Sequence, residues 1–435
     1  MRRIDGSVID ELTIDRSIDP RIINPRSTDS STSRRLGAIE PGRLTRLLDP
    51  TILERDAPDR HLLFIEDGVL RARASVWWTA SFKHAGEPVG AIGHYAADDE
   101  STGGEVLRRA CDELRHAGCA MAAGPIDGNT WRPYRFVTER GTERPFFLEP
   151  DNPDDWPGHF TSAGFTVVAT YASAVAEDLG QHDARRATAE RRLARNGVTI
   201  RSLNCDVLDQ ELRRIHALSC RAFEHNFLYV PLDEQEFVDQ YRRLLPFVRA
   251  ELVLLAEHAG DLVGLLFAVP DILRARGSTI DTVVIKTVAA APGRAYAGLG
   301  SVLVAEAHDR AAHMGYTRAI HALMHEQNVS RNISRRYART FRRYALFARR
   351  LTDCRGSGLG TRGSGLGARD PGSGLGIEAL NLEQNWNLEP GTWNWRVPSP
   401  GPRTPDPGPR IPDPGSRIPS NEHLSTPART RALVR

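Results

Sequence analysis

The sequence lacks most features that mark exported, membrane-spanning or metal-binding proteins. Its five cysteines form no CxxC pair and show no metal-ligand spacing, which argues against a zinc site or a disulfide framework. No segment approaches the roughly 20 apolar residues that a membrane-spanning helix needs. The first 20 residues also contain no apolar signal core. We therefore expect a cytoplasmic protein with no membrane partner and no bound metal.

Lysine is almost absent, because Lys83 and Lys286 are the only lysines among 57 basic residues. The formal net charge is only +2, so no global positive field favours nucleic acid. Arginines do gather between Arg331 and Arg350, where they could meet phosphates. Few aromatic residues are interleaved with them, and a solvated face fits this segment better than a nucleic-acid interface.

Composition divides the chain into five segments. Residues 1–38 are polar and residues 351–435 carry Gly/Pro-rich repeats such as GSGLG, so both ends are expected to be disordered. Residues 39–178 and 197–350 alternate strand-like and helix-like patterns, and the charged residues 179–196 indicate a helical linker between them. The alternating pattern predicts an α/β fold for both of these segments.

The most informative unit is a β-rich strand followed by a glycine turn and a helix. TVVIKTVAA is the strand, Pro292 and Gly293 lie in the loop, and Gly298 and Gly300 stand where the helix opens. Glycines let a ligand approach the backbone closely, and the first amides of a helix bind phosphate groups. Neither GxGxxG nor GxxxxGK[ST] is present, so the spacing does not indicate a dinucleotide fold or a P-loop.

This unit resembles the coenzyme A loop of the GNAT (GCN5-related) N-acetyltransferase superfamily, which reads Arg/Gln-x-x-Gly-x-Gly/Ala after a long strand. Gly298 and Gly300 match the two glycine positions, whereas Ala295 stands at the first position and Arg294 lies one residue early. Downstream, Asn328 matches the family's Asn at the start of the next helix. Tyr337 follows nine residues later, where the family more usually has its Tyr seven residues on.

The resemblance covers residues 197–350 in the order strand, two helices, hairpin, long strand, helix, strand, helix, strand. Residues 39–178 are similar to a degraded copy without a glycine loop, closing on Gly164 and Phe165. The resemblance implies a tandem arrangement of two copies, each with a central mixed, largely antiparallel sheet flanked by helices. It also implies acetyl-CoA as acyl donor and a coenzyme site in the second copy. The implied coenzyme-binding residues are Val288, Ala289, Arg294, Tyr296, Ala297, Gly298, Leu299, Gly300, Ser301 and Asn328.

The resemblance also implies direct attack of an amine on the thioester. An ammonium has a pKa near ~10, so a base must remove its proton. We predict Glu326 as that base, with His325 and Asp281 as alternatives, and Tyr337 as the acid for the leaving thiolate. A backbone amide near Val288 or Ala289 would stabilise the oxyanion.

The two histidines of the predicted strand do not indicate a metal site. His321 and His325 are four residues apart, but on a strand that spacing separates them by ~13 Å, which does not suit a metal pair.

The predicted function is acetyl-CoA-dependent N-acetyl transfer to a small-molecule amine or to a protein or peptide amino group. The alternatives are a non-catalytic acyl-CoA-binding or sensing protein and an aminoacyl transferase of tandem GNAT-like fold.

Overall fold

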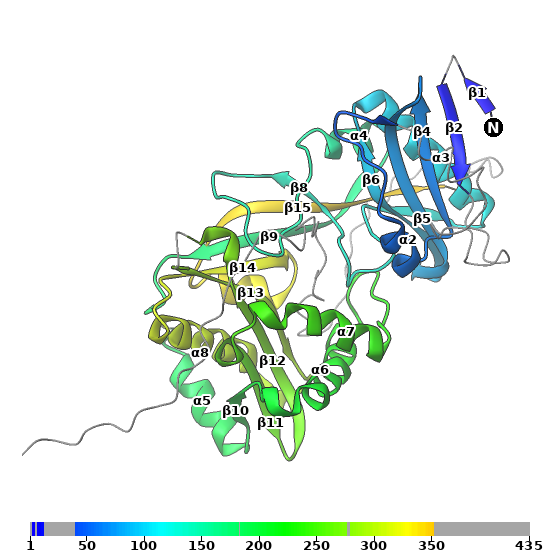
Figure 1. Ribbon diagram of the computed structural model, residues 1–435. Coiled ribbons are helices and arrows are strands. Elements are labelled where there is room, and N and C mark those ends of the chain that lie inside the picture. Colours follow the sequence, from blue (N-terminus) through cyan, green and yellow to red (C-terminus); the bar gives the residue numbers. More distant parts are fainter. Residues whose placement is uncertain (1, 5–6, 13–39, 182, 276–278, 352–435) are drawn as a thin grey trace, which may run out of the picture. The chain divides into compact units, whose positions relative to one another are not determined.

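The computed structural model describes residues 2–4, 7–12 and 40–351, except residues 182 and 276–278 (Figure 1). The repeats that we expect to be disordered occupy residues 351–435, and residues 352–435 lie outside the described range. The strands are β1 (Arg2–Ile4), β2 (Ser7–Leu12), β3 (Glu40–Pro41), β4 (Arg60–Glu66), β5 (Val69–His84), β6 (Glu87–Ala97), β7 (Met121–Gly124), β8 (Phe136–Glu139), β9 (Thr166–Ala176), β10 (Thr199–Ser202), β11 (Val253–His258), β12 (Asp261–Pro270), β13 (Thr282–Ala290), β14 (Arg318–His325) and β15 (Arg339–Arg350).

Helices flank the sheet that these strands form. They are α2 (Pro50–Asp56), α3 (Glu100–His116), α4 (Trp156–Ser162), α5 (Arg186–Arg195), α6 (Leu208–Phe223), α7 (Glu234–Leu244), α8 (Leu299–His313) and α9 (Val329–Ser334), with short 3₁₀ turns between some of them. Within the described residues, no helix combines the length and the apolar character needed to cross a bilayer.

One continuous sheet runs through the described residues in the order β1-β2-β4-β5-β6-β7-β15-β9-β14-β13-β12-β11-β10. The neighbours β6 and β7, and likewise β13 and β14, are parallel, whereas the other pairs along this order are antiparallel. The predicted fold class, a mixed and largely antiparallel sheet flanked by helices, is therefore confirmed.

The centre of the sheet is built by an exchange of strands. β9 comes from the first half of the chain but lies between β14 and β15, and β15 comes from the second half but lies between β7 and β9. In Figure 1 these two long strands run side by side. Their pairing, with Tyr171 opposite Tyr344, crosses the boundary expected between residues 178 and 197.

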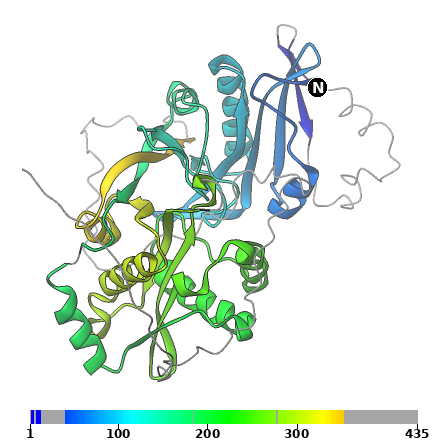
Figure 2. The same cartoon turned by 60° about the vertical axis from the view of Figure 1, so that its left-hand side comes forward.

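The second half follows the predicted order of elements, from β10 through α6, α7 and the β11–β12 hairpin to β13, α8, β14, α9 and β15. Asp233 caps α7, because its side chain accepts from the N–H groups of Gln235 and Glu236. The helices α6 and α7 cover one face of β11–β13, and α8 covers the other (Figure 2). The helix α9 ends at Ser334, before Tyr337.

The structure describes two short strands within residues 1–38, and the expected disorder of this segment remains a prediction. β2 pairs antiparallel with β4, with Val8 opposite Ile65, and β1 pairs with β2. Backbone hydrogen bonds to an open sheet edge need no periodic apolar pattern, and the sequence therefore gave no sign of these strands.

A buried charged network secures the loop that connects β7 to β8. Asp56, at the end of α2, accepts from Nε2 of His94 at 2.9 Å and pairs with Arg55 and with Arg132 of that loop. Arg132 in turn reaches Glu236 of α7 at 2.6 Å. Burial opposes the ionisation of Asp56, but these hydrogen bonds and charges outweigh it and lower its pKa to about 2.

This lowered pKa makes a testable contribution to acid stability. The contribution is complete above the ordinary carboxyl pKa of 3.8 and is lost as the pH falls through about 2. Asp56→Asn removes it, so the gap in unfolding free energy between wild type and variant should narrow by about 2 kcal/mol over that range. Urea titrations at several pH values measure the gap. A gap that stays constant with pH would contradict the assignment, and the exposed Asp154→Asn variant is the control.

Candidate functional site

The candidate site is a cleft where the parallel strands β13 and β14 separate. Thr282–Ile285 pair with Arg318–His321, and the pairing stops there. Lys286 is the extra residue of a β-bulge, because Phe267 pairs with Thr287 whereas Ala268 pairs with Ile285. The empty space between the strands, including the part open to solvent, is about 330 Å³. It is lined by Ile285, Lys286, Thr287, Val288, Val304, His321, Ala322, Met324, Ser330 and Ile333.

The helix α8 begins at this cleft without a side-chain cap. Gly298, the N-cap residue, has φ 85°, a left-handed conformation that favours glycine, and no side-chain capping bond to the first amides occurs among the described residues. A Cβ on Gly300 would meet Ile333 at 3.5 Å and Val288 at 3.6 Å, both lining residues of the cleft. Gly300 thus keeps the helix mouth open toward the cleft, where the free amides and the helix dipole favour an anion.

The predicted coenzyme residues divide into those at the cleft and those turned away. Val288 lines the cleft, whereas Ala289 packs with the core under α6 and α7. Arg294 is exposed, and Tyr296 turns to the β11–β12 hairpin, where its hydroxyl lies 2.9 Å from Nδ1 of His258. Leu299 is buried against the sheet. The residues Ala297, Gly298, Gly300, Ser301 and Asn328 belong to the loop, the first turn of α8 and the start of α9.

The helix α5 and the residue after it contact the glycine loop that precedes α8. Arg192 donates to the carbonyl of Ala297, and Nδ2 of Asn196 donates to Ala295 at 3.1 Å. Arg186 pairs with Asp309 of α8 at 2.6 Å. The sequence indicated an exposed linker helix here, but the helix packs on α8 through these contacts and through the buried Leu193.

Several buried polar atoms around the cleft have no hydrogen-bond partner among the described residues. They are Oγ1 of Thr287, Oγ of Ser330 and Ser334, Oδ1 of Asn328, and Nε and Nη1 of Arg331. Buried polar atoms nearly always have a hydrogen-bond partner in folded proteins. Several buried polar atoms without such a partner, close to an open cleft, therefore indicate a site for a polar ligand.

Glu326, the predicted base, directly follows β14. Its N–H donates to Thr170 of β9 at 3.0 Å, and its carboxylate forms an ion pair with Arg343 of β15. The side chain is 28% exposed. The carboxylate is thus within reach of solvent, but the neighbouring guanidinium balances its charge.

The alternative bases are less available. Burial, with the nearby charge of Arg135, lowers the pKa of His325 to about 4, and its Nδ1 accepts the N–H of Gln327 at 3.2 Å. Asp281 stands at the far end of β13, where its carbonyl accepts from the N–H groups of Thr317 and Arg318. Neither residue lines the cleft, and Glu326 does not line it either.

Tyr337, the predicted acid, packs beside α8 instead of lining the cleft. Its ring lies 5.3 Å from that of His308, centroid to centroid, and it is 6% exposed. Burial, together with the charge of Asp183, raises its pKa. His308 and His321 face each other through their Nε2 atoms at 2.9 Å. Among the described residues, no three His, Cys, Asp or Glu side chains gather as a metal site.

Two contributors to the cleft were missed from the sequence. Lys286 lines it directly and is 4% exposed. The segment 140–152 of the first half, here the 140–152 loop, extends to this part of the second half and places the carbonyl of Leu148 2.7 Å from Nζ of Lys286. The only sequence signal was the rarity of lysine, and nothing marked the loop.

The equivalent separation in the first half is filled by its own chain. β6 and β7 pair only from Val89 to Ala91, after which the N–H of Ile126 donates to the carbonyl of Ile92 at 2.8 Å. Asp99 caps α3, and a Cβ on Gly103 would lie 2.3 Å from the hydroxyl of Tyr95. Among the described residues, the open arrangement of strand and helix mouth therefore occurs in the second half.

No family model matches the chain, and no curated protein matches it. Solved structures with similar folds include a GCN5-related N-acetyltransferase from Sphaerobacter thermophilus, with 12% identity, TM-score 0.41, and coverage of 80% of this chain and 97% of that one. A tandem GNAT protein from the clavulanic acid biosynthesis pathway has 11% identity and TM-score 0.41, with 80% and 99% covered. A fungal multi-domain β-N-acetylglucosaminidase with a GCN5-related glucosamine N-acetyltransferase region has 12% identity and TM-score 0.43, with 79% of this chain and 38% of that one covered. These proteins are described as members of the family that the sequence motifs resemble.

Proposed function

We propose that the protein is an acetyl-CoA-dependent N-acetyltransferase that transfers the acyl group directly to an amine. The supporting observation is the cleft between β13 and β14, open beside the uncapped α8, where Thr287 and Ser330 carry hydroxyl groups without a hydrogen-bond partner among the described residues. The donor set fits a coenzyme A thioester. The uncapped amides after Gly298 suit phosphate oxygens, and β13 beyond Ile285 has no strand partner on its β14 side in the part of the chain that the structure describes.

In this proposal acetyl-CoA supplies the activated acyl group. The protein positions the coenzyme and the acceptor, and it removes the proton of the acceptor ammonium. The first turn of α8 holds the phosphates, while Ser330 and Asn328 add side-chain contacts near the start of α9. The amide of Val288 or Ala289 is assigned to the carbonyl oxygen of the thioester. Glu326 is assigned to remove the proton of the acceptor ammonium, and Tyr337 keeps the proposed acid role.

Gly300→Ala separates ligand binding from folding. The new methyl group meets only ordinary van der Waals neighbours, and alanine favours a helix over glycine, so the melting temperature should not fall. The same methyl group narrows the helix mouth, and we expect coenzyme A affinity to drop on the order of tenfold or more. Isothermal titration with coenzyme A measures the loss.

Gly104→Ala is the matched control, since Gly104 lies early in α3 and a Cβ there meets nothing within 4 Å. It should bind coenzyme A like the wild type. Equal affinity of wild type and Gly300→Ala would refute the proposed helix-mouth site.

A second candidate function is acyl-CoA binding without catalysis. The observation that favours it is the ion pair of Glu326 with Arg343, together with the position of Tyr337 beside His308. A thiol-release assay with acetyl-CoA and a panel of amines distinguishes the two. Amine-dependent release supports transfer, whereas tight binding without release supports the sensing role.

A further inference from the structure

A second cavity, here the α6–α7 cavity, lies between the helices α6 and α7 and the strands β11 and β12. Ten residues line it, and its empty space, including the part open to solvent, is about 350 Å³. It shares no lining residue with the cleft between β13 and β14. Phe267 of β12 lines the α6–α7 cavity, and its strand partner Thr287 lines the cleft. The two spaces are therefore separate but lie against neighbouring strands.

The outer side of the α6–α7 cavity can be located from the burial of its lining. Seven of the ten lining residues are buried, whereas Leu208, Leu245 and Val248 are half-buried. Leu208 is the first residue of α6, and Leu245 directly follows α7. Beside these positions the exposed Asp209 and Arg242 form an ion pair between the two helices, with Nε and Oδ1 3.2 Å apart. A ligand would thus enter where the start of α6 meets the end of α7.

The lining of the α6–α7 cavity is almost entirely apolar. Nine of its ten residues are Leu, Ile, Val or Phe, and no charged residue of the described chain is among them. An ion would lose its hydration here without compensation, which excludes a phosphate group and a protonated amine. A buried water needs two or more polar partners, and the lining side chains offer a single hydroxyl. The lining therefore favours an uncharged, largely apolar occupant.

That single hydroxyl belongs to Tyr241 of α7. The residue is 5% exposed, and its hydroxyl has no hydrogen-bond partner in the part of the chain that the structure describes. Its ring stacks on Phe237 with the centroids 4.2 Å apart and meets Phe267 edge-on at 5.7 Å, so neighbours hold the ring on both sides. Burial raises the pKa of Tyr241, and the hydroxyl consequently stays protonated and able to donate. A buried donor without a partner destabilises a protein unless a ligand supplies an acceptor.

We propose that the α6–α7 cavity binds a small neutral ligand that consists of an apolar body and one hydrogen-bonding group, as in a phenol. The apolar body packs among the aliphatic side chains, and the polar group accepts a hydrogen bond from Tyr241. The empty space, open part included, is near the lower end of the range for ligand pockets, so the ligand is small. This ligand differs in chemistry from coenzyme A and from an acceptor amine, and the inference does not depend on the proposed function.

The test uses the full-length protein with phenol and toluene, two probes of similar shape that differ by a hydroxyl in place of a methyl group. Isothermal titration should detect binding of both probes, and the charged probe benzoate should not bind. Tyr241→Phe should weaken phenol binding about tenfold relative to toluene binding, because only phenol uses the Tyr241 hydroxyl. Tyr229→Phe, the same substitution at a tyrosine outside the lining, is the matched control and should leave the ratio of the two affinities unchanged.

A second variant tests the cavity without changing Tyr241. Leu245→Phe places a larger side chain at the half-buried outer side and should abolish binding of both probes. Melting temperatures verify that the variants are folded, and Tyr241→Phe should not lower the melting temperature, since its hydroxyl has no partner to lose. No binding of phenol to the wild type at millimolar concentration, an unchanged affinity ratio in Tyr241→Phe, or undiminished binding by Leu245→Phe would each overturn the site. Benzoate binding as tight as phenol binding would overturn the neutral chemistry assigned to it.

Discussion

Glu149→Ala is expected to destabilise the protein by about 3–5 kcal/mol, because it leaves the guanidinium of Arg342 buried without its partner. Both side chains of this pair are at most 2% exposed. Burial raises the pKa of Glu149 although Arg342 and Tyr344 oppose the shift. The pair as a whole therefore contributes little net stability, whereas breaking it is costly.

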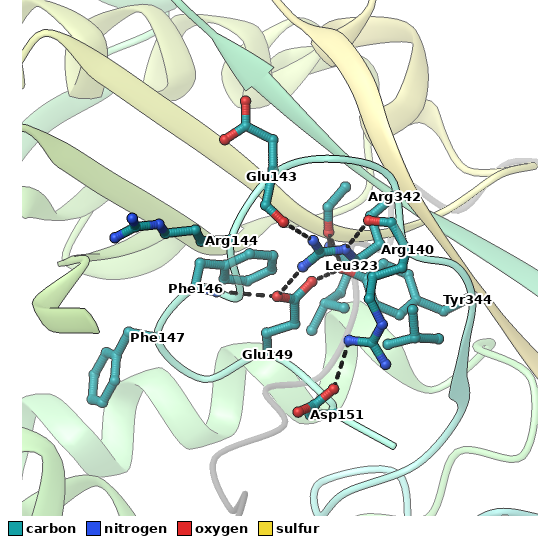
Figure 3. Close-up of polar contacts among 12 residues, drawn as sticks. Arg140, Glu143, Arg144, Phe146, Phe147, Glu149, Asp151, Leu323, Arg342 and Tyr344 are labelled. Carbon is teal, nitrogen blue, oxygen red and sulfur yellow. Dashed lines mark hydrogen bonds and ion pairs between the residues drawn. The ribbon is translucent and has the colours of Figure 1, made fainter. Parts of the chain in front are cut away.

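The location of this pair makes the effect global. Arg342 lies on β15 and also donates to the carbonyl of Arg140 at 2.6 Å, while the N–H of Phe146 donates to Glu149 at 3.0 Å. Loss of Glu149 therefore loosens the 140–152 loop where it meets the exchanged strand (Figure 3). Urea denaturation measures the change in unfolding free energy.

The exposed ion pair of Glu139 with Arg343 on the same strand provides the control. Glu139 is 69% exposed, and Glu139→Ala should cost at most about 1 kcal/mol. Replacing both members of the buried pair, with Glu149→Leu and Arg342→Met, should recover much of the loss. A cost of Glu149→Ala as small as that of the control would show that the buried pair is not needed.

Trp131→Ala is expected to cost about 3–5 kcal/mol through the loss of a fully buried anchor. Trp131 belongs to the loop between β7 and β8 and is 1% exposed. Its ring lies 5.7 Å from Phe237 and 6.2 Å from Phe223, and Nε1 donates to the carbonyl of Val230 at 2.9 Å. A segment of the first half is thus packed between α6 and α7 of the second.

Trp131→Phe separates packing from hydrogen bonding. It retains a ring in the same space and loses mainly the bond to Val230, so we expect about 1–2 kcal/mol. Thermal or urea unfolding should show that the Trp131→Ala variant is clearly less stable than the Trp131→Phe variant. If both variants unfold like the wild type, the loop is not an anchor between α6 and α7.

The cleft is composite, because a loop of the first half contacts a residue that lines it. β9 completes the second half of the sheet, and Leu148 positions Lys286. We therefore expect the second half to depend on the first for its structure and for its proposed chemistry.

The sequence by itself determined the local elements of this protein. The order of strands and helices in residues 197–350, the cap at Asp233 and the glycines at the mouth of α8 follow from periodicity and backbone preference over a few residues. Only the tertiary structure decided the exchange of β9 and β15, the packing of Tyr337 beside His308, and the cleft position of Lys286. These depend on contacts between residues far apart in the chain, such as Leu148 with Lys286, and such contacts leave no short-range pattern in the sequence.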